Sequence, residues 1–482
     1  MEVLQRTANR GSISTGYDID NSCKFEADNS EYLSKTPSSA GNRKTWTLSA
    51  WVKRTELTTE SNSAGNQNMI LSAGNTYIQF DGNAIWVNFR AASENFFLAT
   101  NRLFRDTSAW YHVVLQCDTT QGTASNRAKL WVNGVQETSF QNSTYDGMPL
   151  NYDTLMNSTN EHEVGKSTNE ETTYANLFNG YMAEMHLVDG TALTPTSFGE
   201  FDDDSGIWKP KAYAGSYGTN GFYLDFKDSA NLGNDASGGT DFAETNITSA
   251  DQATDTPTNN FATLNPLIIH GANDYFVITE GGTNIIQSAQ VGWGTMTANI
   301  AVNSGKWYAE IKSASSLVMI GNSQVDDPVT YSVAHLGQLA NTTSLGMGYY
   351  NYSGNIYRNA GDVGYGVAWD SGDIMGIALE FKSDGTANMY VAENNVWINS
   401  ADPAAGTGGV ALNYGNALPT GLHFTFAVAL HNNTGETEVN FGGFTTISIS
   451  SAATDANGYG TFEYAPPTGY YALCTKNLAE YG

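Results

Sequence analysis

Three carboxylates stand close together near the start of the chain. The stretch KFEADNSEYL contains Glu26, Asp28 and Glu31. Retaining hydrolysis of a glycosidic bond needs two carboxyl groups about 5 Å apart, one as nucleophile and one as acid. Glu26 and Asp28 would share one face of a strand, because side chains at i and i+2 point the same way. Asn29-Ser30 interrupts the strand pattern before Glu31, so we interpret the group as a solvated edge and expect no catalytic residue.

A second stretch, GMGYYNYSGNIYRN, has the residue types of a binding surface. Tyrosine offers a flat amphipathic ring at low entropic cost, and asparagine offers adaptable hydrogen bonds. A glycan-binding face needs that combination. The simpler alternative is that alternating tyrosines pack against their neighbours on a strand. The predicted binding residues are Tyr349, Tyr350, Tyr352, Asn355 and Tyr357.

Metal ligands are sparse in the sequence. The acidic run Asp202-Asp203-Asp204 would suit calcium, although a solvated loop is the commoner reason for such a run. The seven histidines are scattered, without a pair at metal-ligand spacing. Cys23, Cys117 and Cys474 are too far apart to predict a disulfide framework or a zinc site. We expect no metal and no cofactor, with calcium as the one alternative.

The composition excludes some classes of partner. The 482 residues carry 22 Lys+Arg against 49 Asp+Glu, a net charge of −27. Such a charge repels the phosphates of nucleic acids and anionic lipid surfaces. No apolar run approaches the roughly 20 residues of a membrane span, and the first residues lack the apolar core of a secretory signal. We expect a soluble protein made in a cytoplasm, with no nucleic-acid binding and no membrane insertion.

The clearest β-pattern is the stretch AWYHVVLQCDTTQGTASNRAKLWVNGVQ. Tyr111, Val113, Leu115 and Cys117 share one strand face, which predicts a buried face and a buried thiol. A polar loop and a second alternating run follow, and Asn133-Gly134 predicts a type I′ turn. Similar short strands recur along a chain with 49 glycines. Together they predict an all-β fold of two tandem jelly-roll β-sandwiches.

Changes of pattern divide the chain into four parts. Residues 1–23 are predicted to be an arm with two arginines, Arg6 and Arg10, and plain disorder is the alternative. Residues 24–200 form the first predicted sandwich, and residues 201–265 a turn-rich connector. Residues 266–482 form the second predicted sandwich with a C-terminal tail.

Several long phrases resemble known domain families. SEYLSKTPSSAGNRKTWTLSAWVKR, RDTSAWYHVVLQCDTTQ and FNGYMAEMHLVDGTALTPTSFGE resemble a laminin-G-like, concanavalin-A-like jelly roll that is widespread in proteins of marine bacteriophages. GKWYAEI, YGVAWDSGDIMGIALEF and APPTGYYALCTKNL are similar to a SPRY-like domain. The resemblance covers nearly the whole chain after residue 24. Laminarinase-type glycoside hydrolases share the concanavalin-A-like fold, and Glu26, Asp28 and Glu31 match their E-x-D-x-x-E pattern.

The resemblance implies a virion structural protein, a tail fibre or another exposed adhesin that binds host-surface polysaccharide without catalysis. Its expected partners are other virion proteins, that polysaccharide and further copies of the chain. A trimer is favoured, although the chain has no heptad stalk. The expected place is the virion, assembled in the host bacterial cytoplasm. Two alternatives stay open: a capsid decoration or tail structural protein with no receptor role, and a depolymerase that uses Glu26 and Glu31.

Overall fold

The computed structural model divides into two compact units. Ser14–Thr258 is the N-terminal unit and Asn259–Gly482 the C-terminal unit. Residues 1–15 of the expected arm, Arg6 and Arg10 among them, lie outside the described residues, whereas Ser22 and Cys23 at its expected end belong to the first strand of the N-terminal unit. The structure describes residues 16–57, 67–91, 94–167, 176–271, 276–287, 292–314, 317–325, 336, 345–358, 361–431 and 435–482.

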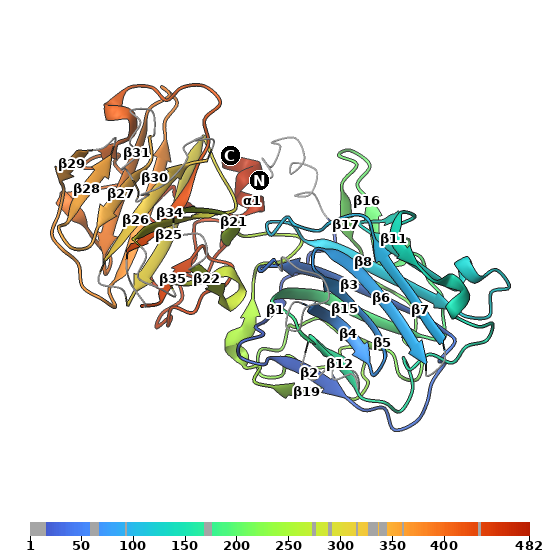
Figure 1. Ribbon diagram of the computed structural model, residues 1–482. Helices are drawn as coiled ribbons and strands as arrows, with labels where there is room; N and C mark the ends of the chain where they lie inside the picture. The colour runs from blue at the N-terminus through green and yellow to red at the C-terminus, as the bar shows by residue number, and fades with distance from the viewer. Residues whose placement is uncertain are drawn as a thin grey trace. The chain divides into compact units, whose positions relative to one another are not determined.

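Two antiparallel sheets form the N-terminal unit (Figure 1). The first has the order β10-β9-β8-β3-β15-β1-β20, with β18 paired to β15; the second has the order β11-β7-β6-β5-β4-β12-β2-β19. The first consists of β1 (Ser22–Phe25), β3 (Thr45–Arg54), β8 (Tyr111–Asp118), β9 (Ala128–Val132), β10 (Val135–Gln136), β15 (Gly180–Asp189), β18 (Phe222–Leu224) and β20 (Gln252–Ala253). The second consists of β2 (Tyr32–Lys35), β4 (Gln67–Ala73), β5 (Thr76–Asp81), β6 (Ala84–Ala91), β7 (Glu94–Thr100), β11 (Phe140–Ser143), β12 (His162–Val164) and β19 (Ala243–Thr245). Two short hairpins, β13 (Lys166–Ser167) with β14 (Asn176–Leu177) and β16 (Gly199–Phe201) with β17 (Trp208–Pro210), complete the unit.

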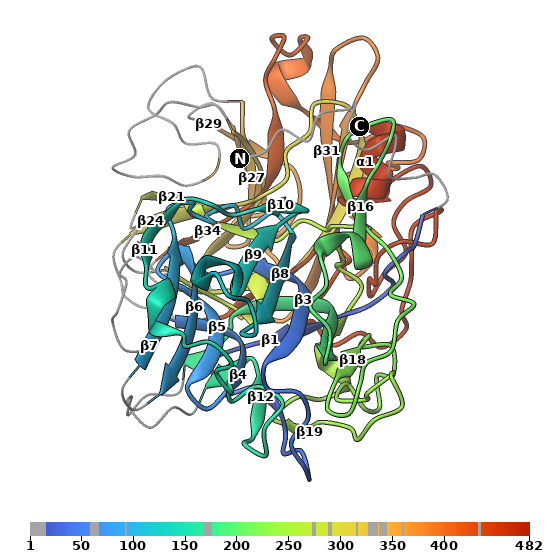
Figure 2. The same cartoon turned by 90° about the vertical axis from the view of Figure 1, so that its right-hand side faces the viewer.

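The predicted meander is confirmed in the first sheet. Strands β8, β9 and β10 are consecutive neighbours, as Figure 2 shows. Tyr111, Val113, Leu115 and Cys117 all lie in the core between the two sheets. Asn133 and Gly134 have φ angles of 50° and 77°, as a type I′ turn between β9 and β10 requires.

The opposite face of the first sheet is also covered, which the sequence pattern did not predict. The indole Nε1–H of Trp208 donates to His112 Nδ1 at 2.9 Å, and the Trp51 ring stacks on the same imidazole. Trp208 comes from the β16–β17 hairpin, inside the segment expected to be a connector. Strands β18, β19 and β20 of that segment also join the two sheets. The units therefore divide at residues 258 and 259, and residues 201–258 belong to the N-terminal sandwich.

The C-terminal unit is a second β-sandwich. Its seven-stranded sheet has the order β21-β24-β34-β26-β27-β28-β29, and its nine-stranded sheet has the order β22-β23-β35-β25-β30-β31-β32, with β33 paired to β31 and β36 parallel to β25. The first contains β21 (Leu264–Gly271), β24 (Trp293–Ala298), β26 (Val318–Gln324), β27 (Met347–Tyr350), β28 (Asn355–Arg358), β29 (Gly361–Gly364) and β34 (Phe424–His431). The second contains β22 (Phe276–Thr279), β23 (Asn284–Gln287), β25 (Gly305–Ser313), β30 (Ile374–Phe381), β31 (Ala387–Glu393), β32 (Val396–Trp397), β33 (Val410–Ala411), β35 (Thr437–Asn440) and β36 (Tyr471–Ala472).

Helical structure is limited to short elements within the described ranges. The α-helix α1 (Thr475–Tyr481) ends the C-terminal unit. The 3-10 turns are η1 (Ala124–Asn126), η2 (Tyr145–Gly147), η3 (Pro195–Ser197), η4 (Ser249–Asp251), η6 (Glu280–Gly282), η7 (Ile398–Ser400) and η8 (Leu412–Gly415). Among the residues described, no helix is long and apolar enough to cross a membrane. The expected fold class, all-β with two tandem β-sandwiches, is confirmed.

Candidate functional site

Four aromatic side chains gather on the outer face of the seven-stranded sheet, the face turned away from the nine-stranded sheet. Trp293 comes from β24, Tyr350 from β27, Tyr357 from β28, and Tyr352 follows β27. The ring centroid of Tyr350 lies 5.6 Å from that of Trp293, 5.8 Å from that of Tyr357 and 6.0 Å from that of Tyr352. We call these four residues the aromatic platform.

The alternation of each strand places these rings outside the core. On β27 and β28, Tyr349 and Ile356 belong to the core between the sheets, so Tyr350 and Tyr357 project from the opposite face. Met296 of β24 is in the same core, which directs Trp293 outward as well. The platform is thus a product of strand period and sheet order.

Small side chains beneath the platform allow the rings to meet. Strands β34 and β26 lie between β24 and β27 in the sheet. On the outer face they present Ala427, Ala429 and Met319, against which Trp293 and Tyr350 pack. Because two of these three side chains are alanines, the indole has room to lie across the intervening strands and reach Tyr350.

The platform is partly open to solvent. Tyr352 is 73% exposed, whereas Trp293, Tyr350 and Tyr357 are half-buried. The imidazole of His431, on β34, lies at one side with its centroid 4.9 Å from that of Trp293. Partial burial lowers the pKa of His431 below its ordinary value, which favours a neutral ring beside the indole. The surface is therefore aromatic and uncharged at its centre.

The structure brings together three of the five predicted binding residues. Tyr350, Tyr352 and Tyr357 share the platform. Tyr349 is fully buried, and its hydroxyl donates to the carbonyl of Val367 at 2.5 Å. Asn355 lies at the start of β28, where its Nδ2 donates to Asp362 Oδ2 at 2.7 Å and supports the β28–β29 hairpin.

Sequence reasoning missed Trp293 and His431. Neither lies near the tyrosine-rich stretch in sequence, and β24 reaches it only through the order β24-β34-β26-β27. The one local signal is a lone tryptophan between two glycines, Gly292 and Gly294, at the start of a strand. That signal predicts a strand but says nothing of its neighbours.

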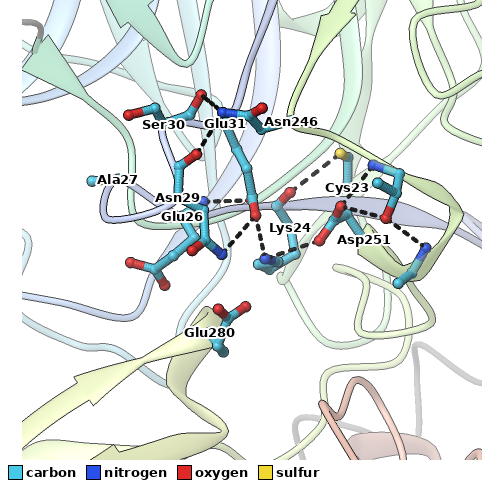
Figure 3. Close-up of polar contacts among 12 residues, drawn as sticks. Cys23, Lys24, Glu26, Ala27, Asn29, Ser30, Glu31, Asn246, Asp251 and Glu280 are labelled. Atoms are coloured by element: carbon cyan, nitrogen blue, oxygen red, sulfur yellow. Dashed lines mark hydrogen bonds and ion pairs between the residues drawn. The ribbon is translucent and has the colours of Figure 1, made fainter. Parts of the chain in front are cut away.

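The three carboxylates near the start of the chain do not form a solvated edge. Glu26 and Glu31 are buried, and only Asp28 is exposed. Glu31 Oε1 accepts from Lys24 Nζ at 2.8 Å and from Asn29 Nδ2 at 3.1 Å, while its Oε2 accepts from the backbone N–H of Glu26 at 2.8 Å (Figure 3). Both oxygens of Glu31 thus hold the turn between β1 and β2 together. The expectation of solvation was wrong because a buried lysine on the preceding strand neutralises the site.

The acidic run of the predicted calcium alternative is organised around Lys209. Asp202 Oδ1 accepts from the backbone N–H of Ser205 at 2.9 Å, and Oδ2 accepts from Lys209 Nζ at 3.1 Å. These hydrogen bonds lower the pKa of Asp202 to about 2. Across the described ranges, no three His, Cys, Asp or Glu side chains converge as metal ligands would. Cys23, Cys117 and Cys474 are free thiols in buried positions.

The N-terminal unit matches a known family. Residues 27–197 match the family described as the Concanavalin A-like lectin/glucanases superfamily. The laminin-G-like expectation for this part of the chain is confirmed. Among curated proteins, none matches the chain.

Solved structures, SPRY domains among them, also match part of the chain. A crystal structure of a human SPRY domain is 18% identical, covers 34% of this chain and 94% of its own, and has a TM-score of 0.25. The SPRY domain of human HERC1 is 15% identical, with a TM-score of 0.27; the match covers 36% of this chain and 96% of the HERC1 domain. The stonustoxin structure is 16% identical, with a TM-score of 0.26; the match covers 37% of this chain and 27% of the stonustoxin chain.

Proposed function

We propose that this protein is a bacteriophage virion structural protein, a tail fibre or another exposed adhesin, that binds host-surface glycans without catalysis. The phage assignment rests on the sequence phrases that resemble phage jelly-roll proteins. The binding assignment rests on one observation, the aromatic platform of Trp293, Tyr350, Tyr352 and Tyr357. The family description of residues 27–197, which names lectins and glucanases, supports carbohydrate as a ligand class for the N-terminal unit, while the platform belongs to the C-terminal unit.

The chemistry of the platform suits a neutral sugar ring. An aromatic face is apolar and slightly negative, so it attracts the C–H bonds on the flat side of a pyranose, while a tyrosine hydroxyl at the ring edge can hydrogen-bond. Rings at different inclinations, 67° between Trp293 and Tyr350 and 81° between Tyr350 and Tyr357, offer both faces and edges. Tyr352 is the exposed end of the platform, while the buried Leu336 packs on the same face of the sheet; an exposed aromatic side chain beside such a cluster is typical of an interaction site.

Such a patch binds one sugar weakly. An exposed adhesin compensates by carrying several copies of the site, because each further contact forms at a high effective concentration once the first is made. Assembly of further copies of the chain, with a trimer favoured, and partnership with other virion proteins belong to the same proposal. Both carboxylate oxygens of Glu31 already accept hydrogen bonds within the unit. This supports the non-catalytic part of the proposal, since the nucleophile of a glycosidase must be free to attack the sugar.

Two measurements test the proposal. Purified protein is titrated onto host cells before intact phage is added, and binding to isolated host polysaccharide is measured for Tyr352→Ala. We expect saturable blocking of adsorption and a loss of polysaccharide affinity of several-fold or more in the variant. Tyr414→Ala is the matched control, because Tyr414 is an exposed tyrosine of the same unit and lies outside the platform.

If a folded protein in its native oligomer leaves phage adsorption unchanged, the alternative is favoured: a capsid decoration or tail structural protein without receptor binding. Release of reducing ends from the polysaccharide, lost in Glu26→Gln, would contradict the non-catalytic assignment. Equal affinity for Tyr352→Ala and the control would remove the platform as the binding surface.

A further inference from the structure

The amino group of Lys24 lies between two carboxylates inside the N-terminal unit (Figure 3). Its Nζ is 2.8 Å from Glu31 Oε1 and 2.9 Å from Asp251 Oδ1. The three side chains are only 1%, 3% and 8% exposed. Taking one ammonium and two carboxylates out of water is costly. A reaction that removes a pair of these charges is therefore favoured by the surroundings.

The carboxyl group of Asp251 is held in a fixed orientation. Its Oδ2 accepts from the backbone N–H of Thr248 at 2.8 Å and from the Thr248 hydroxyl at 3.2 Å, in the capping box that begins η4. Its Oδ1 faces Lys24. The two Thr248 donors lie where negative charge develops when a nucleophile adds to the carboxyl carbon. A lysine amine that has lost a proton is such a nucleophile.

Glu31 is placed to move protons at this site. Its Oε1 contacts the Lys24 amine, and its Oε2 is anchored by the backbone N–H of Glu26. Burial raises the pKa of the Glu31 carboxyl, an effect that the charge of Lys24 partly opposes. A carboxyl whose pKa is raised toward neutrality exchanges protons with an amine more readily than a solvated one does.

We propose that Lys24 and Asp251 form an intramolecular isopeptide bond, with Glu31 as the group that carries a proton from the attacking nitrogen to the leaving oxygen. The ammonium first passes one proton to Asp251 Oδ1, which leaves a neutral amine beside a neutral acid. Nζ then adds to Cγ while Glu31 takes a second proton from the nitrogen. Glu31 returns that proton to Oδ1, the Cγ–Oδ1 bond breaks, and water leaves.

The step balances without a co-reactant. One N–C bond forms and one C–O bond breaks. Of the three ammonium hydrogens, one stays on the amide nitrogen and two leave in the water. The opposite charges of the ammonium and the carboxylate disappear together, and Glu31 ends in the protonation state in which it began.

The bond would join the two ends of the N-terminal unit. Lys24 is on β1, the first strand, and Asp251 immediately precedes β20, the last. A force that pulls on the ends of the unit would run through the bond and leave the sheets between them unloaded. The same link would reduce the freedom of the unfolded chain, so the unit resists heat and denaturant.

The intact mass of the full chain, measured after denaturation, tests the bond. We expect a mass lower than that of the sequence by one water, after allowing for any loss of the initiator methionine. Proteolysis is expected to give a branched peptide that joins the segments around Lys24 and Asp251. A folded protein with the full mass of its sequence would overturn the proposal.

Variants then assign the roles. Glu31→Gln keeps the size of the side chain and is expected to restore the full mass; a folded Glu31→Gln protein that still loses water would remove Glu31 as proton carrier. Lys53 and Asp255 provide the matched control, since they form a second buried pair at 2.6 Å whose carboxyl is bonded to the Trp110 indole. An indole N–H does not carry protons as a carboxyl does, so this pair is expected to stay unlinked.

Lys24→Met and Lys53→Met locate the bond independently. We expect Lys24→Met to have the full mass of its sequence and Lys53→Met to be lighter than its sequence by one water. The reverse result would place the bond between Lys53 and Asp255 and would overturn the proposal. Should Glu31→Gln fail to fold, the mass of the unaltered protein and its branched peptide still decide whether the bond exists.

Discussion

Tyr349 and Tyr350 are consecutive residues of β27 that lie on opposite faces of the seven-stranded sheet. The Tyr349 ring is fully buried in the core and its hydroxyl donates to the carbonyl of Val367. The Tyr350 ring contacts Trp293 and Tyr357 on the outer face. Because successive side chains of a strand point to opposite faces, Tyr349 stabilises the core whereas Tyr350 forms part of the outer surface.

This separation predicts different effects of the same substitution. Tyr349→Ala removes a core ring and is expected to lower the free energy of unfolding of the C-terminal unit by about 3 to 5 kcal/mol, as for other aromatic-to-alanine changes in cores. Tyr352→Ala, at the exposed end of the platform, is expected to change that free energy by no more than about 0.5 kcal/mol. Urea unfolding monitored by tryptophan fluorescence measures both. A large destabilisation by Tyr352→Ala would mean that the platform is structural packing.

The Asn133-Gly134 turn gives a second prediction. Gly134 has a φ of 77°, and a Cβ added there would lie 2.3 Å from the Trp208 ring. Gly134→Ala therefore combines a left-handed backbone with a clash, and we expect a loss of about 2 kcal/mol or more in the stability of the N-terminal unit. Gly122→Ala is the control, because a Cβ at Gly122 meets no atom within 4 Å. Equal melting temperatures for the two variants would contradict the packing of Trp208 on this turn.

The contrast between the two faces of β8 shows how far the sequence alone can predict the fold. The face of Tyr111, Val113 and Leu115 is apolar, and a local alternation suffices to place it in a core. The face of His112 looks half-polar, yet His112 is fully buried because Trp208 packs on it from nearly a hundred residues away. Local period predicts a strand and its apolar face; it does not predict which distant segment covers the other face.

The candidate sites show the same limit. Tyr350, Tyr352 and Tyr357 were predicted together because they are close in sequence, whereas Trp293 joins them only through the pairing of four strands. The buried lysines are harder still to predict, since a charged residue on a strand is normally expected at the surface. Lys24 is buried between two counter-charges: Glu31, which follows it closely in the sequence, and Asp251, which comes from the other end of the unit.

Removing one charge of the buried pair Lys53 and Asp255 is expected to lower the free energy of unfolding strongly. Nζ and Oδ2 are 2.6 Å apart, and both side chains are almost completely buried. Lys53→Met leaves the Asp255 carboxylate without that cation, so we expect the free energy of unfolding to fall by about 3 to 5 kcal/mol. Lys211→Met is the control, because Lys211 and Glu200 form an exposed pair at 3.7 Å, worth about 1 kcal/mol or less. Chemical denaturation of both variants tests the difference, which a similar loss for each would contradict.

His112 predicts a loss of stability in acid. Burial, with a smaller contribution from the nearby His186, lowers the pKa of His112 to about 3. Trp208 donates to Nδ1, so the neutral imidazole carries its proton on Nε2, which faces Ser49 Oγ at 2.8 Å. In the unfolded chain the histidine has an ordinary pKa near 6.5, so it binds a proton below that pH, whereas the imidazole in the folded protein stays neutral. The stabilising contribution is therefore complete above about pH 6.5 and decreases as the pH falls toward 3.

His162 acts in the same direction, because burial lowers its pKa to about 4. We expect the free energy of unfolding of the N-terminal unit to fall by a few kcal/mol, on the order of 1.4 kcal/mol per pH unit for each histidine, between pH 6.5 and pH 4.5. Urea titrations at a series of pH values measure this slope. His112→Gln is expected to reduce it, and His423→Gln, in the C-terminal unit, to leave it unchanged. A slope that survives in full in His112→Gln would show that His112 takes up a proton in the folded protein, which would contradict its hydrogen bond from Trp208.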